Sequence, residues 1–132
     1  MIPTALSLDA DFLALRKIGP WLHALLAEIG DERRTAVFGR IELAIHELAT
    51  NSIEHGAPQD GAIHLSAEVN GTELLVVLRD NGVECDVSDI STPDPDDPQV
   101  RGYGMMIIEQ VASSLDYERS DDNNVWTAIF AI

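Results

Sequence analysis

The sequence predicts an α+β fold, a two-layer α/β sandwich in which a mixed, mostly antiparallel sheet carries helices on one face. Apolar residues recur at helical spacing in three segments, and strand-like patterns occupy the stretches between them. The dipeptide Asn70-Gly71, which separates two apolar stretches, is a strong signal for a hairpin turn. With 132 residues and 45% hydrophobic content, residues 1–132 are expected to form one domain with a buried core.

The N-terminal part is expected to contain a short strand and then a helix. Residues 4–8 alternate like a strand, and Asp9 or Asp11 could cap the helix that follows. Apolar residues keep helical spacing as far as Gly30, which is a plausible C-terminal cap. Pro20 interrupts this pattern and should kink or divide the helix because it lacks a backbone N–H.

A second helix is expected at roughly residues 32–55, capped by Asp31. Its core stripe consists of four apolar residues, Val37, Ile41, Ile45 and Leu48. Glu47, Asn51 and His55 follow one another at intervals of four, so they share one face of this helix. That row is rotated by about 100° from neighbouring stripe positions and should lie at the edge of the buried face, where a ligand could reach it.

The C-terminal part is expected to contain strands around one further helix. Residues 63–69 alternate, while residues 74–78 are apolar throughout, which suggests a strand covered on both faces. The third helix contains regularly spaced apolar residues at Met105, Ile108, Val111 and Ala112. Residues 115–120 and 124–131 are expected to close the fold as a hairpin.

Residues 84–100 differ from the rest of the chain. They contain five aspartates, three prolines and no helical periodicity. Such a segment has little apolar surface to bury against the entropic cost of ordering. We expect a mobile lid here rather than a domain linker, because the sequence indicates no second domain after it.

The composition excludes several classes of function. The net charge of −15 argues against nucleic acid as a direct partner, and Arg33-Arg34 is too small a basic cluster to change this. The acidity suits a basic protein partner, although a solubilising surface is equally compatible. Lys17, the only lysine, does not follow a glycine-rich turn, so the chain has no Walker A loop.

The sequence also bears on redox state and location. Cys85 is the only cysteine, which excludes an internal disulfide and a cysteine-based zinc cluster. No run of about 18 apolar residues is present, and no basic region precedes an apolar run at the start. We therefore expect a cytoplasmic protein that does not use a membrane.

Three short motifs carry the chemistry. The first contains Glu47 and Asn51 on a helix, the second is Asp80-Asn81-Gly82 after a buried strand, and the third is Gly102-x-Gly104 before a helix. Taken singly, they are more often solvated helix residues, a simple turn and a common loop feature. The three in this order, each on the element it needs, predict a nucleotide site.

This arrangement resembles the ATP-binding domain of the GHKL superfamily, shared by histidine kinases, type II topoisomerases and MutL. Within that superfamily the chain resembles the small anti-sigma-factor serine/threonine kinases of bacterial partner-switching systems. The resemblance covers nearly the whole chain and implies a Bergerat-type ATP-binding fold. It is carried by Glu47-x-x-x-Asn51-Ser52-Ile53-Glu54-His55-Gly56, by Asp80-Asn81-Gly82-Val83-x-x-Asp86 and by Gly102-x-Gly104-Met105-x-Ile107-Ile108.

The resemblance implies that ATP and Mg²⁺ are the cofactors, and it assigns roles to the first motif. Asn51 is implied as the metal ligand, and its neutral oxygen suits Mg²⁺, which otherwise keeps waters and phosphate oxygens. Glu47 is implied as the catalytic general base, one helical turn away and close enough to reach an acceptor hydroxyl.

The second motif is implied to bind the base of the nucleotide. Asp80 would accept a hydrogen bond from the exocyclic amine of adenine, since an ionised carboxylate is acceptor-only. Gly82 would let the backbone approach the ring. Thr127, in the closing hairpin, is a weaker candidate to assist Asp80 through water.

The third motif is implied to bind the phosphates. Backbone N–H groups at Gly102 and Gly104 would point toward the anionic groups at a helix start. Arg101 could contact a phosphate, and a solvent-exposed role is about as plausible. Two positions depart from the pattern, because Glu84 and Arg101 stand where glycines are frequent. A carboxylate at Glu84 close to the nucleotide would weaken binding by repelling phosphates.

The expected function is an ATP-dependent serine/threonine kinase that acts as an anti-sigma factor. Its implied partners are a small anti-sigma-factor antagonist, which it phosphorylates, and a sigma factor or similar regulator. A homodimer is also compatible, because the family often dimerises. The alternative is a nucleotide-binding switch without phosphoryl transfer, which the presence of both Glu47 and Asn51 disfavours. A histidine kinase fragment is the third reading, disfavoured because His46 and His55 lie within the nucleotide motif.

Overall fold

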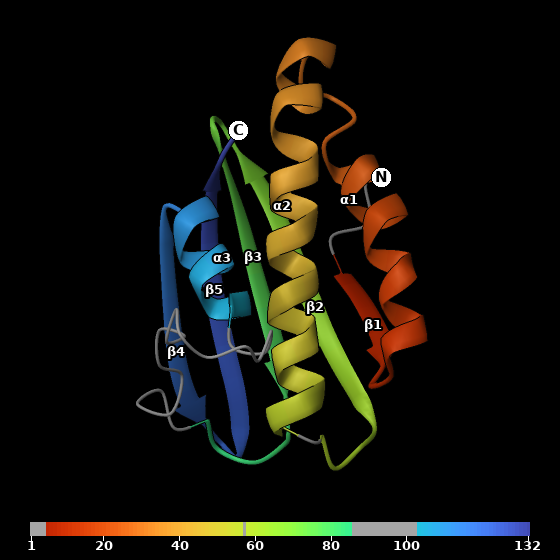
Figure 1. Cartoon of the computed structure of the whole chain (residues 1–132), viewed down its shortest axis with the longest axis vertical. Helices are drawn as coiled ribbons and strands as arrows, with labels where there is room; N and C mark the ends of the chain where they lie inside the picture. The colour runs from red at the N-terminus through yellow and green to blue at the C-terminus, as the bar shows by residue number, and fades with distance from the viewer. Residues whose placement is uncertain (1–4, 57, 86–102) are drawn as a thin grey trace.

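The computed structural model describes residues 5–56, 58–85 and 103–132, in which five strands form one sheet with helices on one face (Figure 1). The strands are β1 (Ala5–Asp9), β2 (Ala62–Asn70), β3 (Glu73–Asp80), β4 (Ser114–Ser120) and β5 (Asn123–Ala131). The helical elements are η1 (Phe12–Lys17), α1 (Ile18–Leu25), α2 (Asp31–Asn51), η2 (Ser52–Gly56) and α3 (Tyr103–Val111). The strand order is β1-β2-β3-β5-β4, and all four pairings are antiparallel. The predicted two-layer α+β sandwich is confirmed, and among the described residues the sheet is antiparallel throughout rather than mixed.

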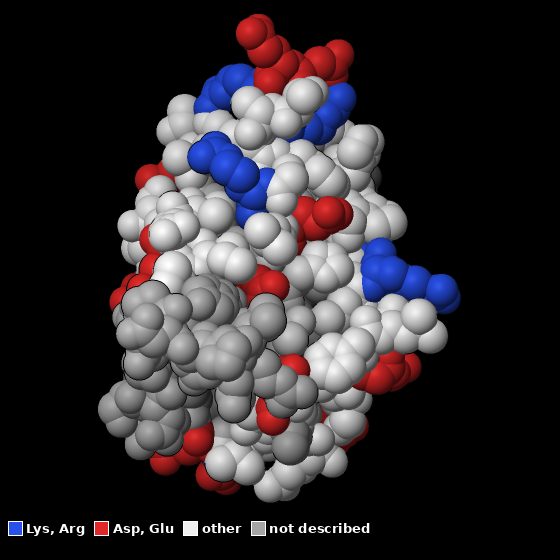
Figure 2. All heavy atoms as spheres, in the orientation of Figure 1, with Lys and Arg blue, Asp and Glu red and all other residues white. Residues whose placement is uncertain are grey.

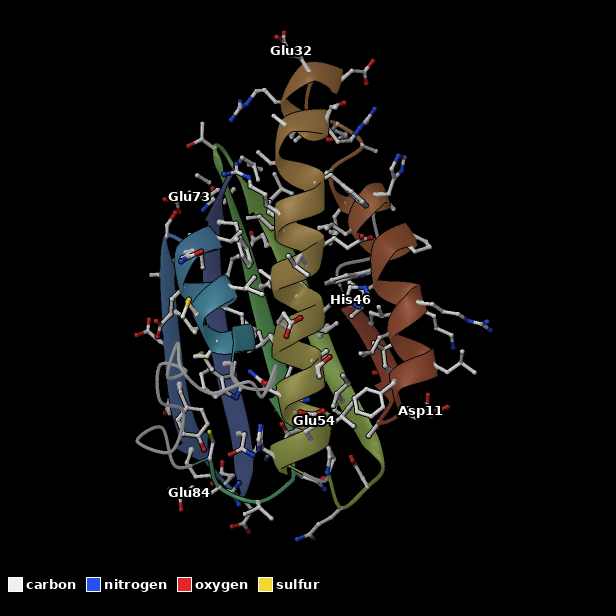
Figure 3. The ribbon with its side chains drawn as sticks, viewed as in Figure 1. Asp11, Glu32, His46, Glu54, Glu73 and Glu84 are labelled. Carbon is white, nitrogen blue, oxygen red and sulfur yellow. The ribbon has the colours of Figure 1, made fainter. Side chains whose placement is uncertain are left out.

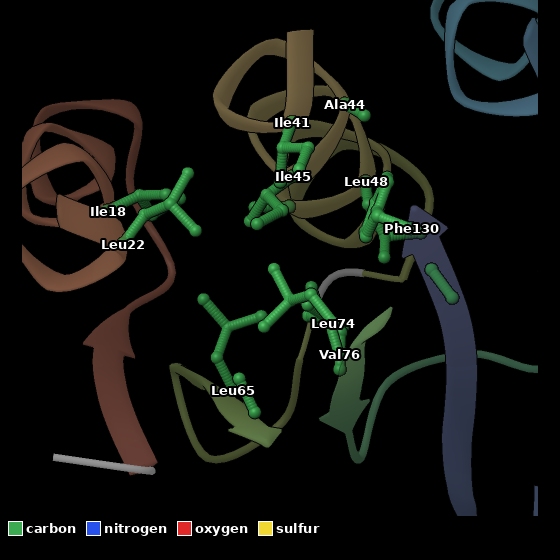
Figure 4. Close-up of a cluster of buried hydrophobic side chains, with 14 of the residues drawn as sticks. Ile18, Leu22, Ile41, Ala44, Ile45, Leu48, Leu65, Leu74, Val76 and Phe130 are labelled. Carbon is green, nitrogen blue, oxygen red and sulfur yellow. The ribbon is translucent and has the colours of Figure 1, made fainter. Parts of the chain in front are cut away.

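The core fills the space between the helices and the inner face of the sheet. The predicted stripe of α2 is buried, with Ile41, Ile45 and Leu48 at most 2% exposed. Figure 4 shows where the layers meet: Ile18 and Leu22 of α1, Ile41, Ala44, Ile45 and Leu48 of α2, and Leu65, Leu74, Val76 and Phe130 of the sheet. Burying each large aliphatic side chain contributes about 1.5–3 kcal/mol, so this layer fixes α2 across the strands.

The outer face of β3 corrects one prediction. Leu74, Val76 and Leu78 are fully buried, whereas Leu75 and Val77 are only half-buried. The apolar run therefore does not mark a strand covered on both faces. Helices cover one face only, and the outward residues are shielded laterally by neighbouring strands in an antiparallel sheet.

The first helical region is divided, but not at Pro20. Asp11 caps the short 3₁₀ helix η1, where its Oδ1 accepts a hydrogen bond from the backbone N–H of Ala14 at 2.8 Å. Helix α1 then begins at Ile18, which places Pro20 in its first turn. Backbone N–H groups in a first turn have no partner within the helix, so a proline is tolerated there.

The junction between α1 and α2 also differs from the prediction. Helix α1 ends at Leu25, and Gly30 is the residue before α2, with φ −58°. Gly30 is therefore not a left-handed C-terminal cap. Asp31 is the first residue of α2 rather than its cap, and its carboxylate pairs with Arg34 one turn later.

Helix α2 ends in a wider turn that positions the site. It stops at Asn51, and the π-helical turn η2 carries the chain to Gly56. A π-turn takes more residues per turn than an α-helix, so the interval of four that aligned His55 with Glu47 and Asn51 no longer holds. His55 is exposed, whereas Ser52 is buried.

Two tight hairpins set the register of the sheet. Gly71 adopts φ +63° in the β2–β3 turn, and Asp121 and Asp122 adopt φ 50° and 62° in the β4–β5 turn. Left-handed conformations at the centre of two-residue turns match the twist of the flanking strands. These turns fix the β2–β3 and β4–β5 pairs, and the pairing of β3 with β5, which are not consecutive in the chain, places Asn124 directly opposite Asp80.

The surface of the helical layer carries a large share of the cationic groups. Figure 2 shows blue atoms over the upper part of α2 and beside α1, with red atoms around them. Five of the eight lysines and arginines lie in η1 and α2: Arg16, Lys17, Arg33, Arg34 and Arg40.

None of the helices described here is both long and apolar enough to cross a bilayer.

Gly39 offers a test of α2 that is independent of the site. It is exposed in the helix interior, and a Cβ added there would meet nothing within 4 Å. Gly39→Ala should therefore raise the free energy of unfolding by about 0.5–1 kcal/mol, because glycine loses more backbone entropy than alanine on folding. Urea denaturation monitored by circular dichroism would measure the difference. A lower midpoint would contradict the described environment of this residue.

Candidate functional site

A buried carboxylate forms the centre of the site. Asp80 ends β3, is 1% exposed and accepts three hydrogen bonds. The Ser52 hydroxyl donates to Oδ2 at 2.6 Å, while the Gly82 N–H and the Asn124 amide donate to Oδ1 at 2.8 and 2.9 Å. A buried charge is tolerated when hydrogen bonds satisfy it, so these three donors hold Asp80 in place as an acceptor.

The hydrogen bonds to Asp80 are unevenly distributed. A carboxylate has roughly four lone-pair directions, two on each oxygen. From the described residues, Oδ1 accepts two hydrogen bonds and Oδ2 accepts one. One acceptor direction on Oδ2 therefore remains for a donor from outside these residues.

Two glycines bring the turn after β3 against the end of η2. A Cβ on Gly82 would lie 2.0 Å from the carbonyl oxygen of Gly56, and that oxygen accepts a hydrogen bond from the Val83 N–H at 2.7 Å. A Cβ on Gly56 would in turn lie 3.2 Å from Oδ1 of Asp80. The absence of a side chain at Gly82 is thus required by contact with the protein's own backbone, independently of any ligand.

The closing hairpin holds the same turn from the other side. Asn124 is 2% exposed, and its amide nitrogen donates to the Val83 carbonyl at 2.8 Å as well as to Asp80. Its amide oxygen accepts from the Tyr117 hydroxyl and, at 3.1 Å, from Arg119. Arg119 also donates to the Gly82 carbonyl at 2.8 Å. We call Tyr117, Arg119 and Asn124 the hairpin clamp.

Tyr117 takes part in the hairpin clamp as a neutral phenol. Its hydroxyl accepts a hydrogen bond from the Cys85 N–H at 2.9 Å and donates to Asn124. Burial raises the pKa of Tyr117, and the hydrogen bond from the Cys85 backbone opposes this to a smaller extent. The ring packs on Trp126 with a centroid distance of 4.7 Å, so the hydroxyl is held by packing as well as by its partners.

Thr127 does not lie where the sequence analysis expected it. It pairs with Val77 across the β3–β5 ladder and is three residues from Asn124, so its side chain is on the outer face of the sheet. Asp80 and Asn124 are on the inner face. The prediction that Thr127 assists Asp80 is wrong, and Asn124 makes that contact.

The structure brings the first and third motifs together. A Cβ on Gly104 would lie 2.5 Å from Oε2 of Glu47, so the Glu47 side chain of α2 reaches the first turn of α3. Negative charge is stabilised at a helix N-terminus by the helix dipole. Asn51 lies one turn beyond Glu47 and is half-buried, like Glu47 itself.

Part of the predicted site lies outside the described residues. This part comprises Arg101, Gly102 and positions 86–100 of the predicted lid, whose roles stay predictions. At the start of that segment Glu84 is exposed, and Figure 3 shows it at the lower edge of the fold. Its expected effect on phosphates also remains a prediction.

Four side chains of the site were not predicted from the sequence: Ser52, Tyr117, Arg119 and Asn124. Ser52 belongs to the first motif, but its part in binding Asp80 depends on the π-turn after α2. The β3–β5 register places Asn124 opposite Asp80, and the β4–β5 register places Arg119 opposite Asn124. A buried polar side chain opposite the end of β3 would have been the signal, and neither burial nor register is visible in the sequence.

Comparisons with known proteins show the family and the fold. The profile of the histidine kinase-like ATPase domain family matches residues 8–130. Anti-sigma F factors from two strains of Clostridium kluyveri are 30% identical to this chain over 84 residues, covering 59% of this chain and 58% of theirs. The chain thus spans less than two thirds of the length of these curated relatives.

Solved structures extend the comparison to the fold. The structure of the RsbU and RsbW domains of Rv1364c from Mycobacterium tuberculosis has a TM-score of 0.67 at 23% identity, covering 98% of this chain and 32% of that one. The Acinetobacter baumannii histidine kinase AdeS has a TM-score of 0.53 at 15% identity, covering 96% of this chain and 66% of that one. The match over residues 8–130 decides the assignment, and the chain belongs to the histidine kinase-like ATPase domain family.

Proposed function

We propose that this protein is an ATP-dependent serine/threonine kinase that acts as an anti-sigma factor. It would phosphorylate a small antagonist protein and sequester a sigma factor or a similar regulator. The observation that carries the proposal is the buried Asp80 carboxylate, whose Oδ2 accepts one hydrogen bond from the described residues and has a second acceptor direction left for a ligand. Family membership and the similarity to anti-sigma F factors support the finer assignment.

Base recognition would take place at Asp80. The exocyclic amine of adenine is a donor and would complete the hydrogen bonding of Oδ2. Ser52, Gly82 and Asn124 supply the other donors, so the carboxylate need not reorganise when the base binds. This preorganisation reduces the entropic cost of binding.

Phosphate binding and transfer would take place between α2 and α3. The first turn of α3 begins close to Gly104, and helix N-termini bind phosphate through backbone N–H groups. Glu47 already lies against this turn and would act as the general base for the acceptor hydroxyl. Gly102 and Arg101 would add contacts to the phosphates.

Magnesium would take most of its ligands from the nucleotide. Among the described residues, no group of three or more His, Cys, Asp or Glu side chains could hold a metal ion. Mg²⁺ commonly uses one or two protein oxygens together with phosphates and waters. The Asn51 amide oxygen fits that requirement, and the ion would neutralise charge that develops on the transferred phosphoryl group.

The proposal has two separable parts, binding and transfer. ATP with Mg²⁺ at 100 times its Kd should raise the melting temperature by roughly 10 °C, because a ligand bound only by the native state stabilises it. Transfer would be measured with labelled ATP and a small antagonist protein encoded next to this chain's gene. If ATP with Mg²⁺ does not change the melting temperature, the proposal that the protein binds ATP is refuted.

The transfer experiment also decides between the two functional readings. Label on a serine or threonine of the antagonist supports the kinase. An ATP-dependent complex between the proteins, with no label transferred, would instead identify a partner-switch module that binds ATP without phosphoryl transfer.

A further inference from the structure

We propose that Asn124 is a positioning residue that makes Asp80 selective for a base with an exocyclic amine, and that Tyr117 and Arg119 fix the orientation of the Asn124 amide. This inference rests on the proposed function, in which Asp80 binds adenine. It adds the residues that determine whether Asp80 can perform that role.

The orientation of the Asn124 amide follows from its four partners. Its oxygen faces two donors, the Tyr117 hydroxyl and the Arg119 guanidinium, and its nitrogen faces two acceptors, Asp80 Oδ1 and the Val83 carbonyl. The Tyr117 hydroxyl already accepts from a backbone N–H, so its single hydrogen is directed to Asn124. If the amide were flipped, its NH₂ group would face the donors of Tyr117 and Arg119, and its oxygen would face the Asp80 carboxylate.

A fixed Asn124 determines what Asp80 can accept. The Asn124 nitrogen and the Gly82 N–H occupy Oδ1, so ligand binding falls to Oδ2. With donors from the protein on both of its oxygens, the Asp80 carboxylate presents only an acceptor to a ligand. An exocyclic amine on the base donates a hydrogen bond to Oδ2. A base that has only a hydrogen atom at this ring position makes no such hydrogen bond, and a carbonyl oxygen at this position is repelled by the carboxylate.

The hairpin clamp also couples this selectivity to the turn after β3. Arg119 donates to the Gly82 carbonyl, and Asn124 donates to the Val83 carbonyl. Together with the contact between Gly82 and Gly56, these bonds hold the turn from both sides. Asp80 is therefore positioned by β5 as well as by its own strand.

The test uses Asn124→Asp, which preserves shape but replaces the donor by a carboxylate oxygen. Calorimetry would measure the affinity for ATP and for purine riboside triphosphate, which lacks the amine. The unmodified protein should prefer ATP by about 10-fold or more, the effect of one hydrogen bond to a charged group. In Asn124→Asp the ratio of the affinity for ATP to the affinity for the amine-free analogue should fall to near one. The affinity for the analogue itself should be largely kept.

A matched control separates the contact from the added charge. Asn123→Asp introduces the same charge one residue away, where the side chain donates to the Asp121 carbonyl in the turn and not to Asp80. It should keep the full preference for ATP. Equal losses of both affinities in Asn124→Asp, or an unchanged preference, would overturn the inference, because a merely structural role does not depend on the amine.

The pH dependence provides a second readout for the same variant. The introduced carboxyl would face Asp80, with Tyr117 and Arg119 on its other side. Two facing carboxyls raise one pKa, and a proton held between them restores a donor to Asp80. The preference of Asn124→Asp for ATP should therefore recover as the pH falls through that raised pKa. A preference that stays at one across the acidic range would count against the mechanism.

Tyr117→Phe decides the outcome if Asn124→Asp does not fold. Removing the hydroxyl takes away one of the two donors that orient the amide, and should lower the preference for ATP with a smaller effect on the analogue. An unchanged preference would overturn the role of Tyr117. If the unmodified protein binds both triphosphates with equal affinity, Asp80 does not distinguish a base with an exocyclic amine, and this inference fails. If the protein binds neither triphosphate, the proposed function itself fails.

Discussion

Glu47→Ala should lower the rate of phosphoryl transfer by about 10²–10⁴-fold while leaving ATP binding intact. A general base acts mainly in the transition state, so its removal affects turnover and not ground-state affinity. The Glu47 side chain lies against the first turn of α3 at Gly104, which is where the phosphates are proposed to bind. Removing a carboxylate from that helix terminus should not weaken, and could strengthen, attraction for an anionic ligand.

The measurement requires both ATP affinity and single-turnover transfer to the antagonist protein. Glu54→Ala serves as the control, because Glu54 is an exposed carboxylate on the turn after α2 (Figure 3). That variant should retain normal transfer. Asn51→Ala should behave differently, with weaker binding of Mg²⁺-ATP and slower transfer together. Normal transfer by Glu47→Ala would refute the assignment of the base.

Asp80→Asn should abolish the rise in melting temperature caused by ATP. The donors from Gly82 and Asn124 would retain the amide oxygen at the Oδ1 position, so the new NH₂ group would occupy the Oδ2 position. The Ser52 hydroxyl can rotate to accept from it, which keeps the fold. The adenine amine would then meet a donor instead of an acceptor.

The same change at an exposed position provides the control for this variant. Asp116 lies on the outward face of β4, and Asp116→Asn should leave the ATP-dependent shift unchanged. The melting temperature without ATP must also be compared, because loss of a charged hydrogen-bond acceptor can itself cost about 1–3 kcal/mol. A full ATP-dependent shift in Asp80→Asn would exclude Asp80 from the adenine site.

The main elements were predictable because they depend on local patterns. Helical spacing identified the buried stripe of α2, and Asn70-Gly71 identified the β2–β3 hairpin with its positive φ at Gly71. Helix boundaries were less accurate, since the end of α1 at Leu25 and the start of α2 after Gly30 depend on packing. The apolar run of β3 was misread because periodicity does not reveal how many faces of a sheet are covered.

For the site, the sequence by itself determined which residue types are available and in what order. It singled out Glu47, Asn51, Asp80 and Gly82, and its resemblance to a known family gave them roles. Only the tertiary structure decided which of them meet and what supports them. It placed Glu47 at Gly104 and Gly82 against the Gly56 carbonyl.

The tertiary structure also shows that Asn124, and not the predicted Thr127, is the partner of Asp80. A strand alternates its side chains between two faces, so the register of β5 against β3 decides which residue faces the site. Strands β3 and β5 are not joined by a turn, so their register depends on core contacts between distant parts of the chain. The identity of each residue can be read directly from the sequence, whereas the hydrogen-bond partners of the buried Asp80 carboxylate are determined by tertiary packing.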